Sequence, residues 1–337
     1  MTRPIRGIRL PTDRLIMFLF LLACSATSSA PGDSWDVVDL HLHPGDWHDI
    51  PDSTQSFLAS RFPYPFGLQP EVLANAVLSG DAILGELDDA GVSRGVLLSV
   101  YAPRTVGVAS NERVLEALAA DPSRLMGMAS LSTDDWTHQA QAQLQALDAA
   151  LAEPGMVGIK LAGAHQHFRL DDPAYFDIYD VAVAHGVPVY HHTGPSPFPG
   201  TRTEPPYTDP AYLESAVAAY PQIAFVLGHV GYDFLDRHLD QGFDAALDLA
   251  SRYDNVFLEP SALGSRHGDP DGTILSEVFL RVREAGLADR VIYGSDGPQS
   301  PGFVADYLSR TLAAMEGWSD DEIAAALGGT FSQVYER

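Results

Sequence analysis

The chain has 337 residues, 46% hydrophobic and 19% charged, a balance that is typical of globular proteins and excludes wholesale disorder. Its 20 basic and 45 acidic residues give a net charge of −25. Nucleic acid is therefore excluded as a main ligand, because phosphate contacts need clustered Lys and Arg. A chain of this length can bury a large core, and α/β barrels of this size form one domain.

The first 23 residues have the pattern of a secretory signal. Four arginines within residues 1–14 precede the apolar run 15–23, which is too short to span a bilayer that needs about 20 residues. Cys24, the one cysteine in the sequence, follows this run and precedes small polar residues. The segment resembles a bacterial lipoprotein signal, in which the cysteine becomes the lipidated first residue. Ordinary cleavage at Ala26 or Ala30 is the alternative.

We predict three parts: a signal peptide (1–23), a tether (24–35) and a folded domain (36–337). The protein would then be extracytoplasmic, either as a membrane-anchored lipoprotein or as a periplasmic or secreted protein. Its membrane contact would be a lipid on Cys24 alone. A single cysteine also excludes an intramolecular disulfide and a thiolate metal site within one chain.

Eight short apolar runs follow the tether, and helical spacing separates most of them. The runs are rich in β-branched residues and nearly continuous in hydrophobicity, as in strands of a parallel sheet that are buried on both faces. They are residues 36–41, 94–101, 124–131, 156–161, 187–192, 223–229, 255–260 and 290–295. Helices are expected at 110–120, 134–152, 211–219, 243–252 and 303–316.

This alternation predicts an α/β protein, a single (β/α)₈ TIM barrel, whose active site lies at the carboxyl ends of the strands. Long connections follow the first and fifth strands, at residues 44–80 and 194–210. Both would lie on the active-site face. Because long loops in compact domains are usually functional, we expect them to form substrate walls or a lid.

Metal-binding side chains gather at the expected strand ends. His41 and His43 flank Leu42 at the end of the first strand, and residues i and i+2 of a strand point to the same side. His192, His229 and Asp296 end the fifth, sixth and eighth runs. A barrel gathers these ends around one axis, so we predict a metal site there. Imidazole and carboxylate ligands without thiolate suit Zn²⁺, Fe²⁺ or Mn²⁺.

Lys160 lies near the end of the fourth run and is the one lysine among the 20 basic residues, the others being arginine. Where a plain positive charge suffices, this chain uses arginine. Lys160 is therefore a candidate for a position that arginine cannot serve, because lysine alone has a pKa that burial shifts readily.

These residues and the sequence around them resemble those of the amidohydrolase superfamily. Within it, the resemblance is to the amidohydrolase-related family that includes aminocarboxymuconate-semialdehyde decarboxylase, γ-resorcylate decarboxylase and several lactonases. It covers about residues 36–335. Its motifs are Asp39-Leu40-His41-Leu42-His43, Gly158-Ile159-Lys160-Leu161, Pro188-Val189-Tyr190-His191-His192-Thr193-Gly194, Gly228-His229-Val230-Gly231 and Gly294-Ser295-Asp296.

The resemblance implies a ligand set for one divalent metal ion, usually zinc: His41, His43, His192 and Asp296. It implies that His229 is an acid/base or polarising group beside the metal. His191 is the competing ligand on the fifth strand, but the Thr-Gly pair that follows favours His192, which leaves His191 on the other strand face.

Lys160 separates two versions of the site. In binuclear amidohydrolases a carboxylated lysine on the fourth strand bridges two metal ions, and His229 would share the second. Members of the family that this chain most resembles carry a lysine there with one metal, so we favour one metal per chain. Lys160 would then hold an anionic group of the substrate or orient His192, and His229 would contact the substrate.

Five further residues are candidates for substrate binding because they lie in the first long loop or follow strand ends: His48, His165, His167, Arg169 and Glu259. They are weaker candidates than the ligand set. For each, a surface or structural role is the alternative.

These residues predict a metal-dependent hydrolase that cleaves an ester, lactone or amide of a small molecule with metal-activated water. Asp296 would take the water's proton and return it to the leaving group, and His229 would stabilise charge on the attacked carbonyl oxygen. One alternative is a non-oxidative decarboxylase of an aromatic or unsaturated acid, with Arg61, Arg169 or Lys160 holding the carboxylate. Another is a non-catalytic lipoprotein binding module. Dimers are common among similar enzymes, so a homodimer is also among the expectations.

Overall fold

The structure is a computed structural model that describes residues 30, 32, 34–61, 69–239, 241–264 and 268–336, without the side chain of Arg61. The chain separates into two units, Met1–Ala30 and Pro31–Arg337. The predicted signal peptide and Cys24 lie outside the described residues, so they stay predictions. Among the described helices, none is both long enough and apolar enough to cross a membrane.

Seven parallel strands form one sheet in the order β1-β2-β5-β6-β7-β8-β9. They are β1 (Val38–Leu42), β2 (Arg94–Leu98), β5 (Leu125–Ala129), β6 (Met156–Leu161), β7 (Val189–His192), β8 (Phe225–Gly228) and β9 (Val256–Glu259). Each coincides with one of the predicted apolar runs. An antiparallel hairpin, β3 (Val100–Ala102) and β4 (Gly107–Ala109), follows β2.

The eighth apolar run closes the sheet through isolated bridges instead of a continuous strand. The Ile292 N–H donates to the Leu258 carbonyl of β9 (2.9 Å), and the Leu40 N–H of β1 donates to the Tyr293 carbonyl (3.0 Å). Residues 291–297 therefore lie between the first and last strands. The predicted TIM barrel is confirmed.

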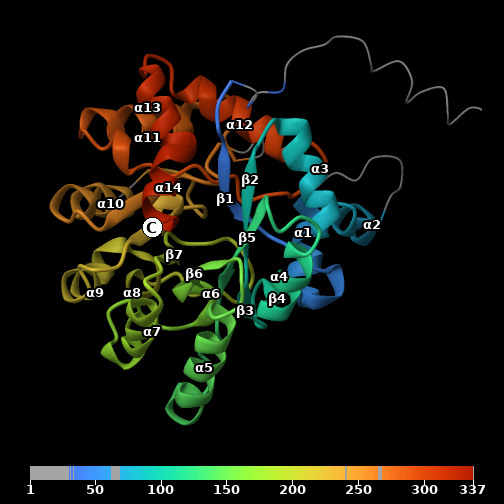
Figure 1. The fold of residues 1–337 in the computed structure, drawn as a ribbon, viewed down its shortest axis with the longest axis vertical. Helices are drawn as coiled ribbons and strands as arrows, with labels where there is room; N and C mark the ends of the chain where they lie inside the picture. The colour runs from blue at the N-terminus through green and yellow to red at the C-terminus, as the bar shows by residue number, and fades with distance from the viewer. Residues whose placement is uncertain are drawn as a thin grey trace, which may run out of the picture. The chain divides into compact units, whose positions relative to one another are not determined.

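Helices surround the strands (Figure 1). The longer ones are α1 (Asp52–Arg61), α3 (Gly80–Ala90), α4 (Asn111–Leu118), α5 (Trp136–Leu151), α7 (Asp177–His185), α10 (Gln241–Arg252), α11 (Thr273–Glu284) and α12 (Phe303–Ala314). Shorter ones are α2 (Pro70–Asn75), α6 (Gly163–Gln166), α8 (Pro205–Thr208), α9 (Glu214–Ala219), α13 (Asp320–Ala324) and α14 (Thr330–Tyr335). Their ends follow local sequence signals: Ser110 caps α4 by accepting the Arg113 N–H, and α7 ends at Gly186 in the left-handed conformation.

Two hydrophobic clusters form the core. The larger one packs the helices against the outer face of the strands. The second draws on inward-facing residues of the barrel, among them Leu98, Tyr190 and Phe257, together with Phe331 and Tyr335 of α14. Arg94, at the start of β2, lies over the Phe331 ring, so α14 covers the amino ends of the strands. The carboxyl ends are thereby left as the face on which polar side chains can gather.

The two long connections differ in structure. Residues 44–80 contain α1, α2 and a 3₁₀ helix at Trp47–Asp49, so the described part of this connection is largely helical and not an irregular loop. Residues 194–210 hold α8 and otherwise lack regular structure. This second connection is tied down by the Gly194 N–H, which donates to the Thr208 carbonyl (2.7 Å).

Candidate metal centre

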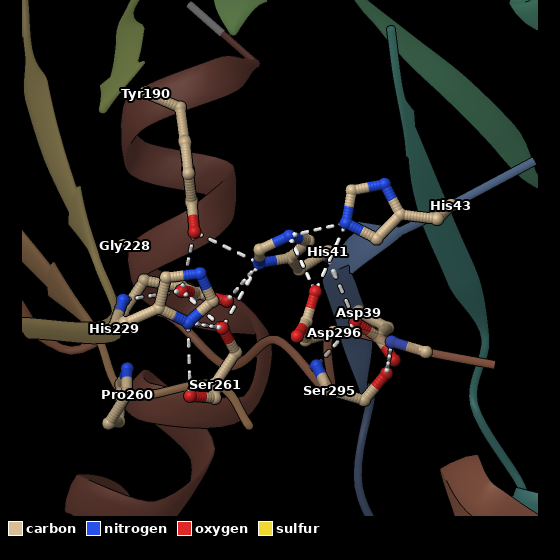
Figure 2. A network of polar contacts seen from close by, with 12 residues as sticks. Asp39, His41, His43, Tyr190, Gly228, His229, Pro260, Ser261, Ser295 and Asp296 are labelled. Atoms are coloured by element: carbon tan, nitrogen blue, oxygen red, sulfur yellow. Dashed lines mark hydrogen bonds and ion pairs between the residues drawn. The ribbon is translucent and has the colours of Figure 1, made fainter. Parts of the chain in front are cut away.

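Three side chains from the two ends of the barrel sequence meet at the carboxyl ends of the strands. His41 and His43 come from the end of β1, and Asp296 comes from the closing segment. The Nε2 atoms of the two histidines lie 3.0 Å apart, and each lies 3.1 Å from Oδ1 of Asp296. Figure 2 shows the two rings and the carboxylate facing one another. The three atoms form a nearly equilateral triangle.

This triangle has the donor set and the spacing of a divalent cation site. Ligand bonds of about 2.0–2.1 Å in tetrahedral arrangement place neighbouring ligand atoms roughly 3.3 Å apart. His192 adds a second indication, because its Nε2 is buried without a hydrogen-bond partner. Leaving such an atom unpaired is costly unless a ligand satisfies it. The residues present therefore fit a divalent cation.

His192 and His191 point to opposite sides of β7. The His192 ring lies inside the barrel, 4.5 Å from the ring of His229, but His192 does not belong to the group of ligand atoms that lie within 4.8 Å of one another. His191 packs outward: its Nε2 lies 3.2 Å from the Tyr179 hydroxyl, and its ring stacks on Phe225. Of the two, His192 is thus the one that faces the histidine cluster.

Asp39 ties β1 to the closing segment beneath the triangle. Its Oδ1 accepts the backbone N–H groups of His41 (3.0 Å) and Ser295 (2.9 Å). Burial raises the pKa of Asp39 to about 7, although these hydrogen bonds oppose the shift. Backbone bonds between His43 and Gly297 and between Gly297 and His41 complete the connection. The positions of His41, His43 and Asp296 are consequently fixed from both ends of the barrel sequence.

His229 lies on a strained turn after β8. His229, Val230 and Gly231 have φ values of 61°, 48° and 73°, and a left-handed conformation is unfavourable for a β-branched residue such as Val230. The Thr193 hydroxyl holds both ends of this turn. It donates to the Gly228 carbonyl (2.7 Å) and accepts the Gly231 N–H (2.8 Å). The residue after His192 thereby fixes the direction of the His229 ring.

The contacts of His229 identify which ring nitrogen carries its proton. Burial lowers the pKa of His229 to about 4, so the ring is neutral at pH 7. Its Nδ1 lies 3.2 Å from the backbone carbonyl oxygen of Ser261, which can only accept a hydrogen bond. The proton is therefore on Nδ1 and Nε2 carries a lone pair. This tautomer favours the predicted acid/base role over the predicted stabilisation of a carbonyl oxygen, which needs a proton on Nε2.

A buried polar network lies behind His41 and His229. The Glu259 carboxylate is fully buried at the end of β9 and accepts the hydroxyls of Tyr190 (2.9 Å) and Ser261 (2.8 Å). Burial raises its pKa to about 7, opposed by His229 and by the two hydroxyls. Its Oε1 lies 3.2 Å from Nδ1 of His41. Because Glu259 has no exposed surface, it supports the histidines from behind instead of lining a surface for substrate.

Lys160 is buried within the barrel, with Nζ 3.8 Å from the centre of the Tyr190 ring. Burial lowers its pKa to about 7, although Asp296 and Glu259 favour its charged form. A lysine whose amine is neutral part of the time can hold an anion or form a carbamate, so the structure is compatible with both predicted roles.

The remaining candidates separate by location. His165 is buried, with its ring 4.7 Å from that of His192 and 6.1 Å from Phe198. The other candidates bind surface groups in the described part of the chain, and none contacts the histidine cluster: His48 pairs with Asp46 and Glu71, His167 with the Gly200 carbonyl, and Arg169 with Asp171. Acidic neighbours hold His48 and Arg169 at the surface, which their positions relative to the strands do not predict.

Sequence reasoning missed four residues that position the candidate ligands: Tyr190, Thr193, Ser261 and Ser295. Tyr190 precedes His192 by two positions on the inward face of β7, and Ser261 follows Glu259 by two positions. The same i, i+2 rule that grouped His41 with His43 could have found both.

Comparisons with known proteins agree with this geometry. The family model described as Amidohydrolase matches residues 38–336. No curated protein matches the chain. An uncharacterised TIM-barrel protein from Bordetella bronchiseptica is similar in structure, with a TM-score of 0.65 and 20% identity, over 88% of this chain and 97% of that one.

Two further solved structures have names that state a reaction. A putative 2-pyrone-4,6-dicarboxylic acid hydrolase from Pseudomonas putida has a TM-score of 0.57 and 21% identity, over 89% of this chain and 97% of that one. A dihydroxybenzoic acid decarboxylase from a Polaromonas species, with bound manganese and the inhibitor 2-nitroresorcinol, has a TM-score of 0.61 and 17% identity, over 90% and 97%. At these identities the likeness shows the shared fold.

Proposed function

Because the chain belongs to the amidohydrolase family, we propose that it is a metal-dependent hydrolase that cleaves an ester, a lactone or an amide of a small molecule. The observation that carries the proposal is the triangle of His41 Nε2, His43 Nε2 and Asp296 Oδ1. The ring of His229, with its Nε2 unprotonated, lies 5.2 Å from that of His41. Hydrolysis needs groups that accept a proton from water, and this arrangement supplies them.

We infer that His41, His43 and Asp296 hold one divalent cation, with His192 completing the set through its unpartnered Nε2. Zinc suits these nitrogen and oxygen ligands, and manganese is the ion named with the Polaromonas enzyme. When bound, such a cation supplies Lewis acidity, which polarises a substrate carbonyl and makes water a stronger acid.

The protein's own residues would manage the proton. Burial alone would raise the pKa of Asp296, but His41, His43 and His229 hold it below its usual range, so the carboxylate is ionised. It can accept a proton from the attacking water and return it to the leaving group. The Nε2 atom of His229 is a second acceptor on the same side of the barrel. Lys160 would bind an anionic group of the substrate.

A second candidate function is the non-oxidative decarboxylation of an aromatic or unsaturated acid. The specific observation in its favour is the buried amine of Lys160, which can hold a carboxylate. The name of the Polaromonas enzyme supports the same reaction class. Arg169 is a weaker partner for that carboxylate because it already pairs with Asp171, and the side chain of Arg61 lies outside the described part of the chain.

One experiment separates the two reactions. The metal-loaded protein is incubated in ¹⁸O-labelled water with a panel of lactones, esters, amides and dihydroxybenzoic acids. Hydrolysis predicts one ¹⁸O atom in the product carboxylate. Release of CO₂ from a dihydroxybenzoate without ¹⁸O in the aromatic product would replace the hydrolase by the decarboxylase. Absence of both across the panel, with metal bound, would overturn the proposal.

A further inference from the structure

Room for the buried Glu259 carboxylate is built into two of the sequence motifs. A Cβ atom at Gly294 would overlap Oε1 of Glu259, and a Cβ atom at Gly228 would overlap the Tyr190 hydroxyl. Glycine is therefore required at both positions for the network to exist. The space is filled by a carboxylate and two hydroxyls, which is an expensive choice for a barrel interior unless each proton has an acceptor.

When the Glu259 carboxylate is ionised, a count of protons gives the direction of the hydrogen bonds that the two hydroxyls make. The Tyr190 and Ser261 hydroxyls have one proton each, and both lie within 2.9 Å of Oε2 of Glu259, to which they donate. Each hydroxyl oxygen is then an acceptor for its other partner. That partner is Nδ1 of His41, at 2.9 Å from Tyr190 and 3.0 Å from Ser261. The two hydroxyl oxygens and Oε1 of Glu259 (3.2 Å) are three acceptors for Nδ1, whereas Nε2 of His41 faces one oxygen acceptor, Oδ1 of Asp296 (3.1 Å), so the count favours the proton on Nδ1.

The same count applies to His229. Its Nδ1 lies 3.0 Å from the Ser261 hydroxyl, whose own proton goes to Glu259, and 3.2 Å from the Ser261 carbonyl. The Nδ1 atoms of both histidines are thus donors into acceptors that one carboxylate orients. In both rings the lone pair is on Nε2. For His41 this is the atom that faces His43 and Asp296.

We propose that Glu259 is a positioning residue that fixes the tautomers of His41 and His229 together, through the Tyr190 and Ser261 hydroxyls. The carboxylate does not touch substrate. It keeps the lone pair of His41 on Nε2, the atom that faces His43 and Asp296, and the lone pair of His229 on Nε2 as well. The expected effect on activity rests on the proposed hydrolase function. The proposed tautomers do not depend on that function.

The isosteric variant Glu259→Gln tests this role. An amide offers one acceptor and one donor where the carboxylate offers two acceptors. If the amide oxygen takes the place of Oε2, the NH₂ group faces His41 and forces the proton to Nε2, where it blocks the cation. We expect metal affinity to fall about 10- to 100-fold, the range typical of lost partners behind metal-binding histidines.

The decisive readout is the tautomer of each ring. The full chain, labelled with ¹⁵N-histidine and stripped of metal by a chelator, is examined by long-range ¹H–¹⁵N correlation, with signals assigned through single histidine substitutions. We expect the Nδ1–H form for His41 and His229 in the wild-type protein. In Glu259→Gln, His41 should change to the Nε2–H form. In Tyr190→Phe, which keeps the carboxylate, His41 should retain Nδ1–H.

Glu86→Gln is the matched control, because Glu86 is also buried but accepts the backbone N–H groups of Gly302 and Val304. It should leave both tautomers and the affinity for Zn²⁺ unchanged. An Nε2–H form of either histidine in the wild-type protein would overturn the proposal, even if Glu259→Gln failed to fold. So would a Glu259→Gln protein with the wild-type tautomers.

The role of Glu259 and the proposed hydrolase function can fail separately. Wild-type tautomers as expected, with no hydrolysis of any panel compound, would overturn the proposed function and leave the role of Glu259 intact. Hydrolysis with the opposite tautomers would do the reverse.

Discussion

Nε2 of His43 lies 3.1 Å from Oδ1 of Asp296, although 253 positions separate the two residues in the chain. The contact exists because the last segment of the barrel closes against the first strand, where Asp39 accepts the Ser295 N–H (2.9 Å). The candidate metal centre therefore depends on closure of the barrel. Any change that loosens the closing segment should loosen the site as well.

The number of metal ions per chain distinguishes the two predicted roles of Lys160. We expect one equivalent of a divalent metal in protein that is purified without chelator and measured by elemental mass spectrometry. Lys160→Arg should keep that one equivalent of metal. Arginine cannot form a carbamate, but a site with one metal ion needs no carbamate. Two equivalents in the wild-type protein, falling to one or none in Lys160→Arg, would instead assign Lys160 as a carbamate bridge.

Replacement of Asp296 by asparagine should lower both metal content and turnover. The amide is a poorer ligand and cannot accept the water's proton, a role worth about 10²- to 10⁴-fold in rate. The control is Asp236→Asn, which alters a described group of acidic and histidine side chains that shares no residue with the candidate centre, Asp233, Asp236 and His238. Equal metal loss in the two variants, measured by elemental analysis, would contradict the placement of the site.

Thr193 should act on catalysis through the turn that carries His229. Thr193→Val removes the hydroxyl that bridges Gly228 and Gly231 and leaves a buried N–H unpaired, which costs about 1–3 kcal/mol in the free energy of unfolding. We expect kcat to fall as well, because the strained turn can relax and turn the His229 ring away. Urea titration and steady-state kinetics measure the two effects.

Two companion variants test whether that loss is specific. Thr193→Ser keeps the hydroxyl and should restore most of kcat. Thr330→Val removes another buried hydroxyl, which bonds the Asp289 carbonyl at the start of α14, and should reduce stability without changing kcat. If Thr193→Val and Thr330→Val reduced kcat equally, Thr193 would have no particular role at the site.

The predicted lipid anchor can be tested without reference to activity. In a bacterial host fed a fatty-acid analogue that carries a chemical handle, the full chain should incorporate the label and sediment with membranes. Cys24→Ser should incorporate none and appear in the soluble fraction. An unlabelled wild-type protein whose amino terminus begins after Ala26 or Ala30 would instead establish ordinary signal cleavage.

The sequence determined the barrel, because strands that are buried on both faces appear as continuous apolar runs. The polar residues at the ends of these runs predicted the candidate ligands. The residues that end the first and eighth runs could be assigned to one site, since a closed barrel brings its first and last strands together. The inward direction of His192 also followed from the sequence motif. Local sequence patterns are enough to predict features of this kind.

Tertiary structure alone decided which of the candidate side chains lie close together. His41 and Ser261 are 220 positions apart, yet the contact between them supports the tautomer that we propose for His41. His48 and Arg169 lie at the surface and pair with acidic residues, whereas Glu259 is buried behind the candidate ligands. Hydrogen bonds form between groups that are close in space. The order of residue types along the chain does not specify which groups these are.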